Sequence, residues 1–312
     1  MSVFLCTLAG DLVALRRDGE SWAATTVLES EHVQCVTTDG ARVLVGTRGG
    51  GALLSPDDGA TWARIELPER DVFSVAIGAA DGALYAGTEP SRLFVARDGG
   101  DWTELEALQD IPSRSRWSFP PRPWTHHVRW VAPDPHRAEV LLVGIELGGV
   151  MRSDDGGATF SDHRPGAKLD VHCLAWHPTA VERAYQAAGD GAAWSRDGGA
   201  TWATADAGRD RGYCWALAVD PHDPERWWVS AATGPGAAHA AERARGRLYR
   251  WDGEWRRLSL PDEAMPYALV AVDGDLLVGM ADGRVLCSGD GGEHVEDTGV
   301  RLGPISAMAA PG

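Results

Sequence analysis

One short pattern recurs along the whole chain and constrains its fold more than any other feature. The pattern reads Ser-x-Asp-x-Gly-x-Thr-Trp, and its most complete copy runs from Ser195 to Trp202. Three other long copies end in Trp62, Phe160 and Val295. Shortened copies keep an Asp-Gly pair followed by an aromatic residue, at Trp22, Trp102 and Trp255. The chain is therefore built from seven diverged units.

Each unit has the composition of a tight turn between two strands. The aspartate accepts hydrogen bonds from backbone N–H groups of the turn, glycine allows a positive φ, and the aromatic residue begins the next strand and packs on the core. Self-similarity with a period of a few tens of residues indicates a radial repeat fold. We therefore predict an all-β fold, a seven-bladed β-propeller of four-stranded antiparallel blades, in a single domain over residues 1–312.

The repeats resemble the Asp-box family, also called BNR repeats, which occurs in sialidases, sortilin-type receptors and photosystem II assembly factors. The resemblance covers nearly the whole chain and implies a fold rather than a function. Sialidases of this family have six blades and an early Phe/Tyr-Arg-Ile-Pro signature, with an Arg triad, a Tyr–Glu pair and an Asp acid. This chain has seven units and lacks the signature. The resemblance therefore does not imply true sialidase activity.

The second unit shows the four expected strands most clearly, at residues 32–38, 42–47, 51–55 and 62–67. The same four strands are expected to begin again at Asp71, His127, Asp170, Tyr213 and Pro266. Residues 3–8 look like the second strand of a blade, and residues 303–309 look like an innermost strand. Pairing these two ends in one blade would close the ring and remove free sheet edges.

Charge and cysteine content restrict the partners and the compartment. The net charge of −16 argues against duplex nucleic acid or an anionic membrane as a partner, and no run of about 18 apolar residues is present. The amino-terminal residues lack the basic region of a signal peptide. Five cysteines without a CxxC pair suggest reduced, buried thiols. We expect a cytoplasmic protein, a monomer or a small homo-oligomer.

The longest insertions are expected on one end of the ring. They cover residues 108–125, 205–212 and 232–247, and all fall in connections that leave the end opposite the Asp-boxes. Loops on a rigid scaffold often carry function, so this end is the candidate active face. The prolines of the first insertion are expected to fix an extended path, with Trp117, Phe119 and Trp124 as a wall of a pocket.

Aligning the seven copies places many polar and aromatic residues around the mouth of the central channel. The first level contains His32, Asp71, His127, Asp170, Tyr213, Met265 and Pro304. The second level, two residues later and so expected on the same side of each strand, contains Gln34, Phe73, Arg129, His172, Trp215, Tyr267 and Ser306. Loops and the first insertion add Arg48, Glu89, Arg92, Arg122, Glu146 and Asp190.

Three interpretations of this set remain open. In the first, His32, His127 and His172 bind one divalent transition metal together with Glu146 or Glu89. In the second, a histidine beside Asp170 or Glu146 moves protons without a metal, while Arg129 and Arg48 hold an anionic group. In the third, the polar residues only line a wet channel.

The convergence of these groups favours a ligand site. We predict a small polar, anionic ligand and a hydrolase or lyase whose catalytic residues are His127, His172, Asp170 and Glu146. The predicted binding residues are His32, Gln34, Arg48, Asp71, Phe73, Glu89, Arg122, Arg129, Tyr213, Trp215 and Tyr267. One alternative is a non-catalytic scaffold for protein assembly, and a second is a glycoside hydrolase with paired carboxylates such as Glu89 and Glu146.

Overall fold

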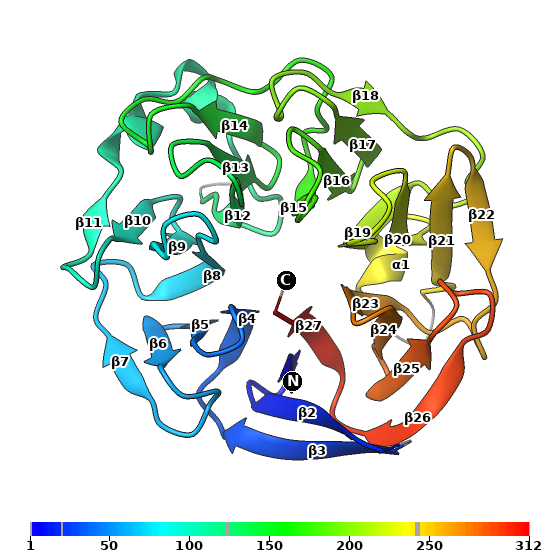
Figure 1. Cartoon of the computed structure of the whole chain (residues 1–312). Coiled ribbons are helices and arrows are strands. Elements are labelled where there is room, and N and C mark those ends of the chain that lie inside the picture. Colours follow the sequence, from blue (N-terminus) through cyan, green and yellow to red (C-terminus); the bar gives the residue numbers. More distant parts are fainter. Residues whose placement is uncertain (1, 20, 123–124, 241–243, 312) are drawn as a thin grey trace.

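Seven small antiparallel sheets surround a central axis in the computed structural model, which describes residues 2–19, 21–122, 125–240 and 244–311 (Figure 1). Six sheets contain four strands, and one contains three within these ranges. The innermost strands of neighbouring blades contact one another all the way around the ring. The predicted seven-bladed propeller is therefore confirmed.

In six blades the strands follow one another outward from the axis in chain order. From inner to outer strand they are β4 (Val33–Thr38), β5 (Val43–Thr47), β6 (Ala52–Ser55) and β7 (Ala63–Ile65); β8 (Asp71–Ile77), β9 (Leu84–Glu89), β10 (Leu93–Ala96) and β11 (Thr103–Glu104); β12 (Val128–Pro133), β13 (Leu141–Ile145) and β14 (Gly149–Ser153); β15 (Val171–Trp176), β16 (Ala184–Ala188), β17 (Gly191–Ser195) and β18 (Ala203–Thr204); β19 (Tyr213–Val219), β20 (Arg226–Ala232), β21 (Arg247–Asp252) and β22 (Trp255–Leu258); β23 (Pro266–Val272), β24 (Asp275–Met280), β25 (Arg284–Ser288) and β26 (Glu296–Arg301).

The remaining blade joins the two ends of the chain. Its strand order is β27 (Ile305–Ala309), β1 (Ser2–Thr7), β2 (Leu12–Asp18) and β3 (Ser21–Leu28). Phe4 pairs with Ala309, and Leu5 pairs with Met308 in an antiparallel ladder. As predicted, this pairing closes the ring, because it gives β1 a partner along the edge that it would otherwise expose.

The blade of β12–β14 departs from the expected four strands. Only an isolated bridge between Arg152 and Ser161 lies where an outer strand was predicted. The next residue, Asp162, accepts hydrogen bonds from the amide and hydroxyl of Ser113 in the first insertion. Pro165 then turns the chain away, and proline has no N–H to continue a ladder. Single hydrogen bonds, such as that from the amide of Arg164 to the carbonyl oxygen of Val150, therefore replace a continuous outer strand in this blade.

The Asp-box turns have the local hydrogen bonds that their composition predicts. In the second blade, Asp57 accepts hydrogen bonds from the backbone amide of Thr61 at 2.7 Å and from the hydroxyls of Ser55 and Thr61 at 2.9 and 2.8 Å. The indole of Trp62 donates to the carbonyl oxygen of Gly59, whose φ is +87°. Asp155, Asp197 and Asp290 repeat the arrangement, with His294 in place of threonine in the last copy.

In several blades a glycine in the second strand from the axis allows the neighbouring blade to approach closely. Gly144 lies against the side chain of Val171 in the next inner strand, and a β-carbon at this glycine would lie 2.5 Å from Val171 Cγ1. The same packing occurs between the pairs Gly46 and Val72, Gly87 and Val128, and Gly279 and Ile305. These contacts belong to the apolar layers that separate the blades, where Val72, Val128, Val171 and Ile305 are fully buried.

The insertions contain short helices rather than a continuous extended path. The first insertion forms two 3₁₀-helices, η1 (Glu106–Asp110) and η2 (Pro112–Arg116). The predicted extended path is therefore wrong for residues 112–116: the fixed φ and missing N–H of Pro112 suit the first turn of a helix equally well. Residues 232–247 contain α1 (Pro235–Ala238). Among the described residues, no helix is long and apolar enough to span a membrane.

Candidate functional site

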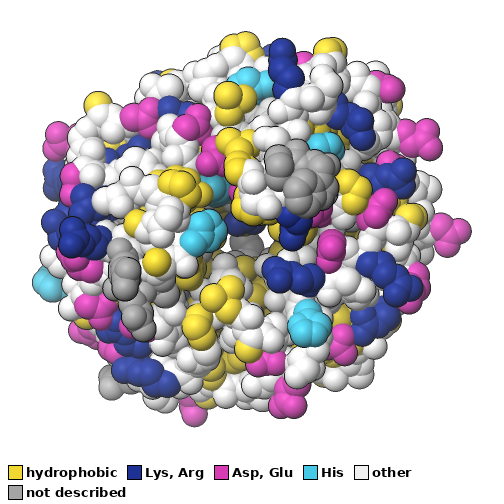
Figure 2. All heavy atoms as spheres, turned by 180° about the vertical axis from the view of Figure 1, so that it is seen from behind, with side chains coloured by type: hydrophobic (Ala, Val, Ile, Leu, Met, Phe, Trp, Pro, Cys, Tyr) yellow, Lys and Arg dark blue, Asp and Glu magenta, His cyan; other side chains and the backbone are white. Residues whose placement is uncertain are grey.

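A cavity of about 350 Å³ lies on the axis of the ring, among the innermost strands. Figure 2 shows the ring from behind, with a central hollow around which hydrophobic, basic and histidine side chains gather. The predicted residues that line the cavity are Gln34, Arg48, Phe73, His127, Arg129, Glu146, His172, Trp215 and Tyr267. Most of the predicted site residues are thus brought together in one place.

Irregular strand pairing explains why the second-level residues face the axis. The antiparallel register of every innermost strand shifts at its second-level residue, as between Val171 and Cys173, where His172 has no partner opposite it. Such β-bulges re-aim a side chain and bend the strand. All seven second-level residues line the cavity: Gln34, Phe73, Arg129, His172, Trp215, Tyr267 and Ser306.

The first-level residues do not share this placement. His127 lines the cavity, whereas the lining does not include His32, Asp71, Asp170 or Tyr213. His32 is exposed and has a positive φ of 55°, in the turn before β4. The expectation that both levels share one side fails here, because a bulge interrupts the two-residue alternation of a strand.

A row of charged groups runs from the first insertion to the cavity. Arg122 Nη2 donates to Glu89 Oε2 at 2.7 Å, and His127 Nδ1 lies 3.4 Å from the same oxygen. On the other side of the ring of His127, Nε2 donates to Glu146 Oε2 at 2.9 Å. Arg129 Nε lies 3.5 Å from that oxygen. His127 is therefore held between two carboxylates, with an arginine beside each.

Both carboxylates of this row are stabilised as anions. Burial alone would raise the pKa of Glu89, but the nearby His127 and the hydrogen bond from Arg122 outweigh burial and lower the pKa to about 2. Burial likewise opposes ionisation of Glu146, and the hydrogen bond from His127 and the charge of Arg129 hold its pKa below the usual value.

Asp170 and His172 form a second group on the neighbouring blade. His172 Nδ1 donates to the carbonyl oxygen of Cys214 at 2.6 Å, which leaves Nε2 as the nitrogen with a lone pair. This Nε2 lies 3.3 Å from the hydroxyl of Tyr213 and 3.8 Å from Asp170 Oδ1. Burial and nearby Glu146 raise the pKa of Asp170 to about 7, while burial and Arg129 lower the pKa of His172 to about 4.

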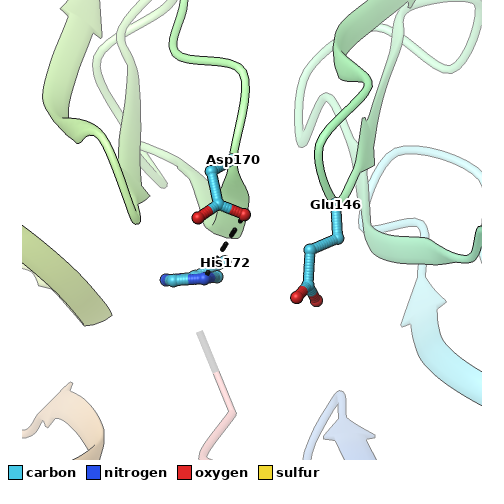
Figure 3. A group of neighbouring side chains, drawn as sticks. All are labelled: Glu146, Asp170 and His172. Carbon is cyan, nitrogen blue, oxygen red and sulfur yellow. Dashed lines mark ion pairs between the residues drawn. The ribbon is translucent and has the colours of Figure 1, made fainter. Parts of the chain in front are cut away.

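Asp170 points toward His172, and Glu146 lies opposite both on the adjacent blade (Figure 3). Each offers one potential ligand atom, and the three atoms lie within 4.8 Å of one another. The metal set expected from the sequence was different, since it contained His32, His127 and His172. The described structure thus groups His172 with two carboxylates, while the exposed side chain of His32 lies outside this group.

Aromatic rings form the walls of the cavity. Phe73 stacks on His127 with ring centroids 4.0 Å apart, and Phe119 meets the same histidine edge-on at 4.9 Å. On the opposite wall, Trp215 lies 5.3 Å from Tyr267. Trp117, predicted as part of the wall, instead packs in the core of its blade with only 5% of its surface exposed. Trp124, the third predicted wall residue, lies outside the described residues.

Two functional groups were missed by the sequence reasoning. His239, just after α1, lies 5.1 Å from Trp215 and lines the cavity. Its place in a long insertion on the candidate face was the only signal that could have singled it out. The carbonyl oxygen of Cys214, which orients His172, gives no sequence signal at all.

The cysteines near the axis have the properties of inert core residues. All five cysteines are free, and Cys35 and Cys173 border the cavity. Burial raises the pKa of each of these two thiols to about 12. Because the thiolate is the nucleophilic form, thiol catalysis does not fit this site.

The fold is shared with several solved structures at low sequence identity. A GH74 xyloglucanase from Xanthomonas campestris aligns with a TM-score of 0.63 and 19% identity over 86% of this chain and 45% of that chain. A GH74 enzyme from Niastella koreensis gives 0.66 and 17% over the same shares of the two chains. YCF48 bound to a D1 peptide gives 0.62 and 15%, over 86% of this chain and 82% of that chain.

The chain spans less than half the length of these GH74 structures. At such identities the likeness extends to the propeller fold only. No protein-family model matches the chain, and no curated protein matches it either.

Proposed function

We propose that the protein binds a small anionic molecule in the axial cavity and acts on it as a hydrolase or lyase. The observation that supports this most is the convergence of Arg129, His127, Glu146 and His172 at one concave, aromatic-walled site, with Asp170 behind the lining next to Glu146 and His172. Convergent polar groups in a largely apolar pocket are the usual form of a small-molecule site.

Distinct roles follow from the contacts. Arg129 and the exposed Arg48 line the cavity and supply positive charge for a carboxylate or phosphate group of the ligand. His127 is the proposed proton carrier, because its Nε2 proton is already shared with Glu146 Oε2 and one face of its ring is fixed by Phe73. His172 faces the reacting group from the next blade, with Asp170 beside it.

Ligand screening combined with two variants tests the proposal. Small carboxylates, inorganic phosphate and phosphate esters are screened for a rise in melting temperature, and those that bind are then followed for turnover by NMR. We expect Arg129→Met to weaken binding of the anions at least tenfold. We expect His127→Gln to retain binding and to lower turnover by about 10²–10⁴, the usual contribution of a general acid–base.

His222→Gln is the matched control, since His222 is exposed in the turn between β19 and β20 at the other end of the ring and its backbone amide donates to Asp220. It should match the wild type in both assays. Turnover that survives unchanged in His127→Gln would show that this histidine does not carry the proton. Anion binding that survives in Arg129→Met would remove the proposed anion site.

A second candidate function is recognition of a protein segment, because the fold of YCF48, a structure with bound peptide, aligns over most of its length. On the present chain, Leu8 borders the cavity and is 64% exposed, so it offers an apolar contact at the rim. Leu8→Glu separates the two functions. If Leu8→Glu loses peptide binding and keeps anion binding, the segment-binding function is supported. If the variant keeps both peptide binding and anion binding, the result argues against the segment-binding function.

A further inference from the structure

We infer that Glu146, Asp170 and His172 form a site for one divalent transition metal ion at the wall of the axial cavity. The inference deepens the proposed function by naming the cofactor class of the same site. Metal binding itself is independent of turnover, so either proposal can fail while the other stands.

The spacing of the donor atoms fits one ion after a small movement. His172 Nε2 and one oxygen of each carboxylate lie within 4.8 Å of one another. Three ligand atoms that bind one ion at about 2.1 Å lie roughly 3.4–3.6 Å apart in a tetrahedral or trigonal arrangement. The donor atoms must therefore approach one another by about 1 Å. Rotation of Glu146 can supply this movement, because its side chain has three rotatable bonds and the residue follows the end of β13.

His172 is oriented as a metal-binding histidine must be. Its Nδ1–H donates to the carbonyl oxygen of Cys214, which fixes the tautomer with the lone pair on Nε2. Rings of Tyr213 and Trp215 pack on it at 4.9 and 5.1 Å, and only 2% of the residue is exposed. A carbonyl partner on the distal nitrogen is the usual outer-shell support of a ligating histidine.

The two carboxylates are also supported from outside the site. Glu146 accepts a hydrogen bond from His127 through Oε2, which leaves Oε1 for an ion. Asp170 is positioned through its backbone, which donates to Asp190 and accepts from the amide of Gly189. Gly189 also provides the space for the carboxylate, because a β-carbon there would overlap Asp170 Oδ2.

The donor set indicates which ions would bind. Two carboxylate oxygens and one imidazole nitrogen suit Mn²⁺, Fe²⁺, Co²⁺ and Zn²⁺ better than soft Cu⁺, and the two negative charges balance a divalent ion. Three protein ligands leave further coordination positions for water or for the anion that Arg129 attracts, as in catalytic rather than structural sites.

The test titrates the protein with metal alone. Wild-type protein is stripped with a chelator, dialysed and titrated with Co²⁺, Mn²⁺ and Zn²⁺ by calorimetry, with the visible absorption of Co²⁺ as a second readout. We expect one ion per chain and a rise in melting temperature at saturation, because the ion binds only the folded state. Asp170→Asn and Glu146→Gln, which change charge but little volume, should each weaken binding at least a hundredfold.

Two controls separate this site from the set expected from the sequence. His32→Ala removes an exposed histidine of that set, and His222→Gln changes an exposed histidine at the other end of the ring. Both should bind the ion as the wild type does. The inference is overturned if none of the three metals binds stoichiometrically, or if Asp170→Asn and Glu146→Gln both retain wild-type affinity while their unfolding midpoints show that they are folded.

Discussion

Replacing Gly144 by alanine tests the packing that sets the spacing between blades. Gly144 is buried in β13, and its backbone φ is not in the left-handed region, so alanine would add only a methyl group. That methyl carbon would lie 2.5 Å from Val171 Cγ1 and 3.3 Å from Leu174 Cδ1. Carbon atoms pack best at about 3.5–4.0 Å, so β15 must move away by about 1 Å.

The expected cost follows from this overlap. Inserting a methylene into a well-packed core typically costs about 1–3 kcal/mol, and we expect Gly144→Ala to lower the free energy of unfolding by that amount. Val171→Ala also destabilises, since Val171 is fully buried, but it removes the overlapping atom. The double variant should therefore be more stable than the sum of the two single effects by about 0.5–3 kcal/mol.

Urea unfolding followed by fluorescence and circular dichroism provides the measurement. The matched control is Gly212→Ala, because no atom of the described residues lies within 4 Å of a β-carbon at Gly212 and its φ is not left-handed. This control should be neutral or slightly stabilising, by up to about 1 kcal/mol. Strictly additive single effects, or equal stability of the two glycine variants, would refute the account of blade spacing.

Three further outcomes are expected. Asp155→Ala should lower the free energy of unfolding by about 1–3 kcal/mol, because it removes the acceptor for the amide and hydroxyl of Thr159 and the hydroxyl of Ser153. The neighbouring Asp154→Ala loses one ion pair at the surface and should lower it by less than about 1 kcal/mol. Equal urea midpoints of the two variants would contradict this. The hydrogen bonds from the Thr159 hydroxyl and amide hold the pKa of Asp155 below its usual value. The contribution of Asp155 to stability is therefore complete above about pH 4 and is lost as the pH falls through the folded-state pKa. Between about pH 5 and about pH 2.5 the wild type should lose more stability than Asp155→Ala, and parallel losses in the two proteins would argue against this. Deletion of residues 303–312 exposes the edge of β1 and should yield a less stable protein that aggregates. Light scattering would detect the aggregation, and the same segment added as a peptide should restore stability. A shortened chain as stable as the full chain would show that β27 is not needed to close the ring.

The local turns could be predicted because their interactions are local. In each Asp-box the partners are only two to four residues apart, as for Ser195, Asp197 and Thr201, so the sequence contains both sides of every hydrogen bond. Repetition of the turn then predicts the number of blades, and the two unpaired end strands predict the closure of the ring. The one three-stranded blade was not predicted, because its outer edge is altered by contact between Asp162 and the distant Ser113.

The sequence alone therefore determined the propeller, its seven blades and many of the residues that surround its axis. Only the tertiary structure decided which of them meet. Bulges in the inner strands turn His172 toward the cavity while leaving His32 outside the lining, and the carbonyl oxygen of Cys214, 42 residues away in the chain, selects the nitrogen that His172 presents. The physical reason is that a bulge and a contact between blades depend on how neighbouring sheets pack, and no short segment contains that information.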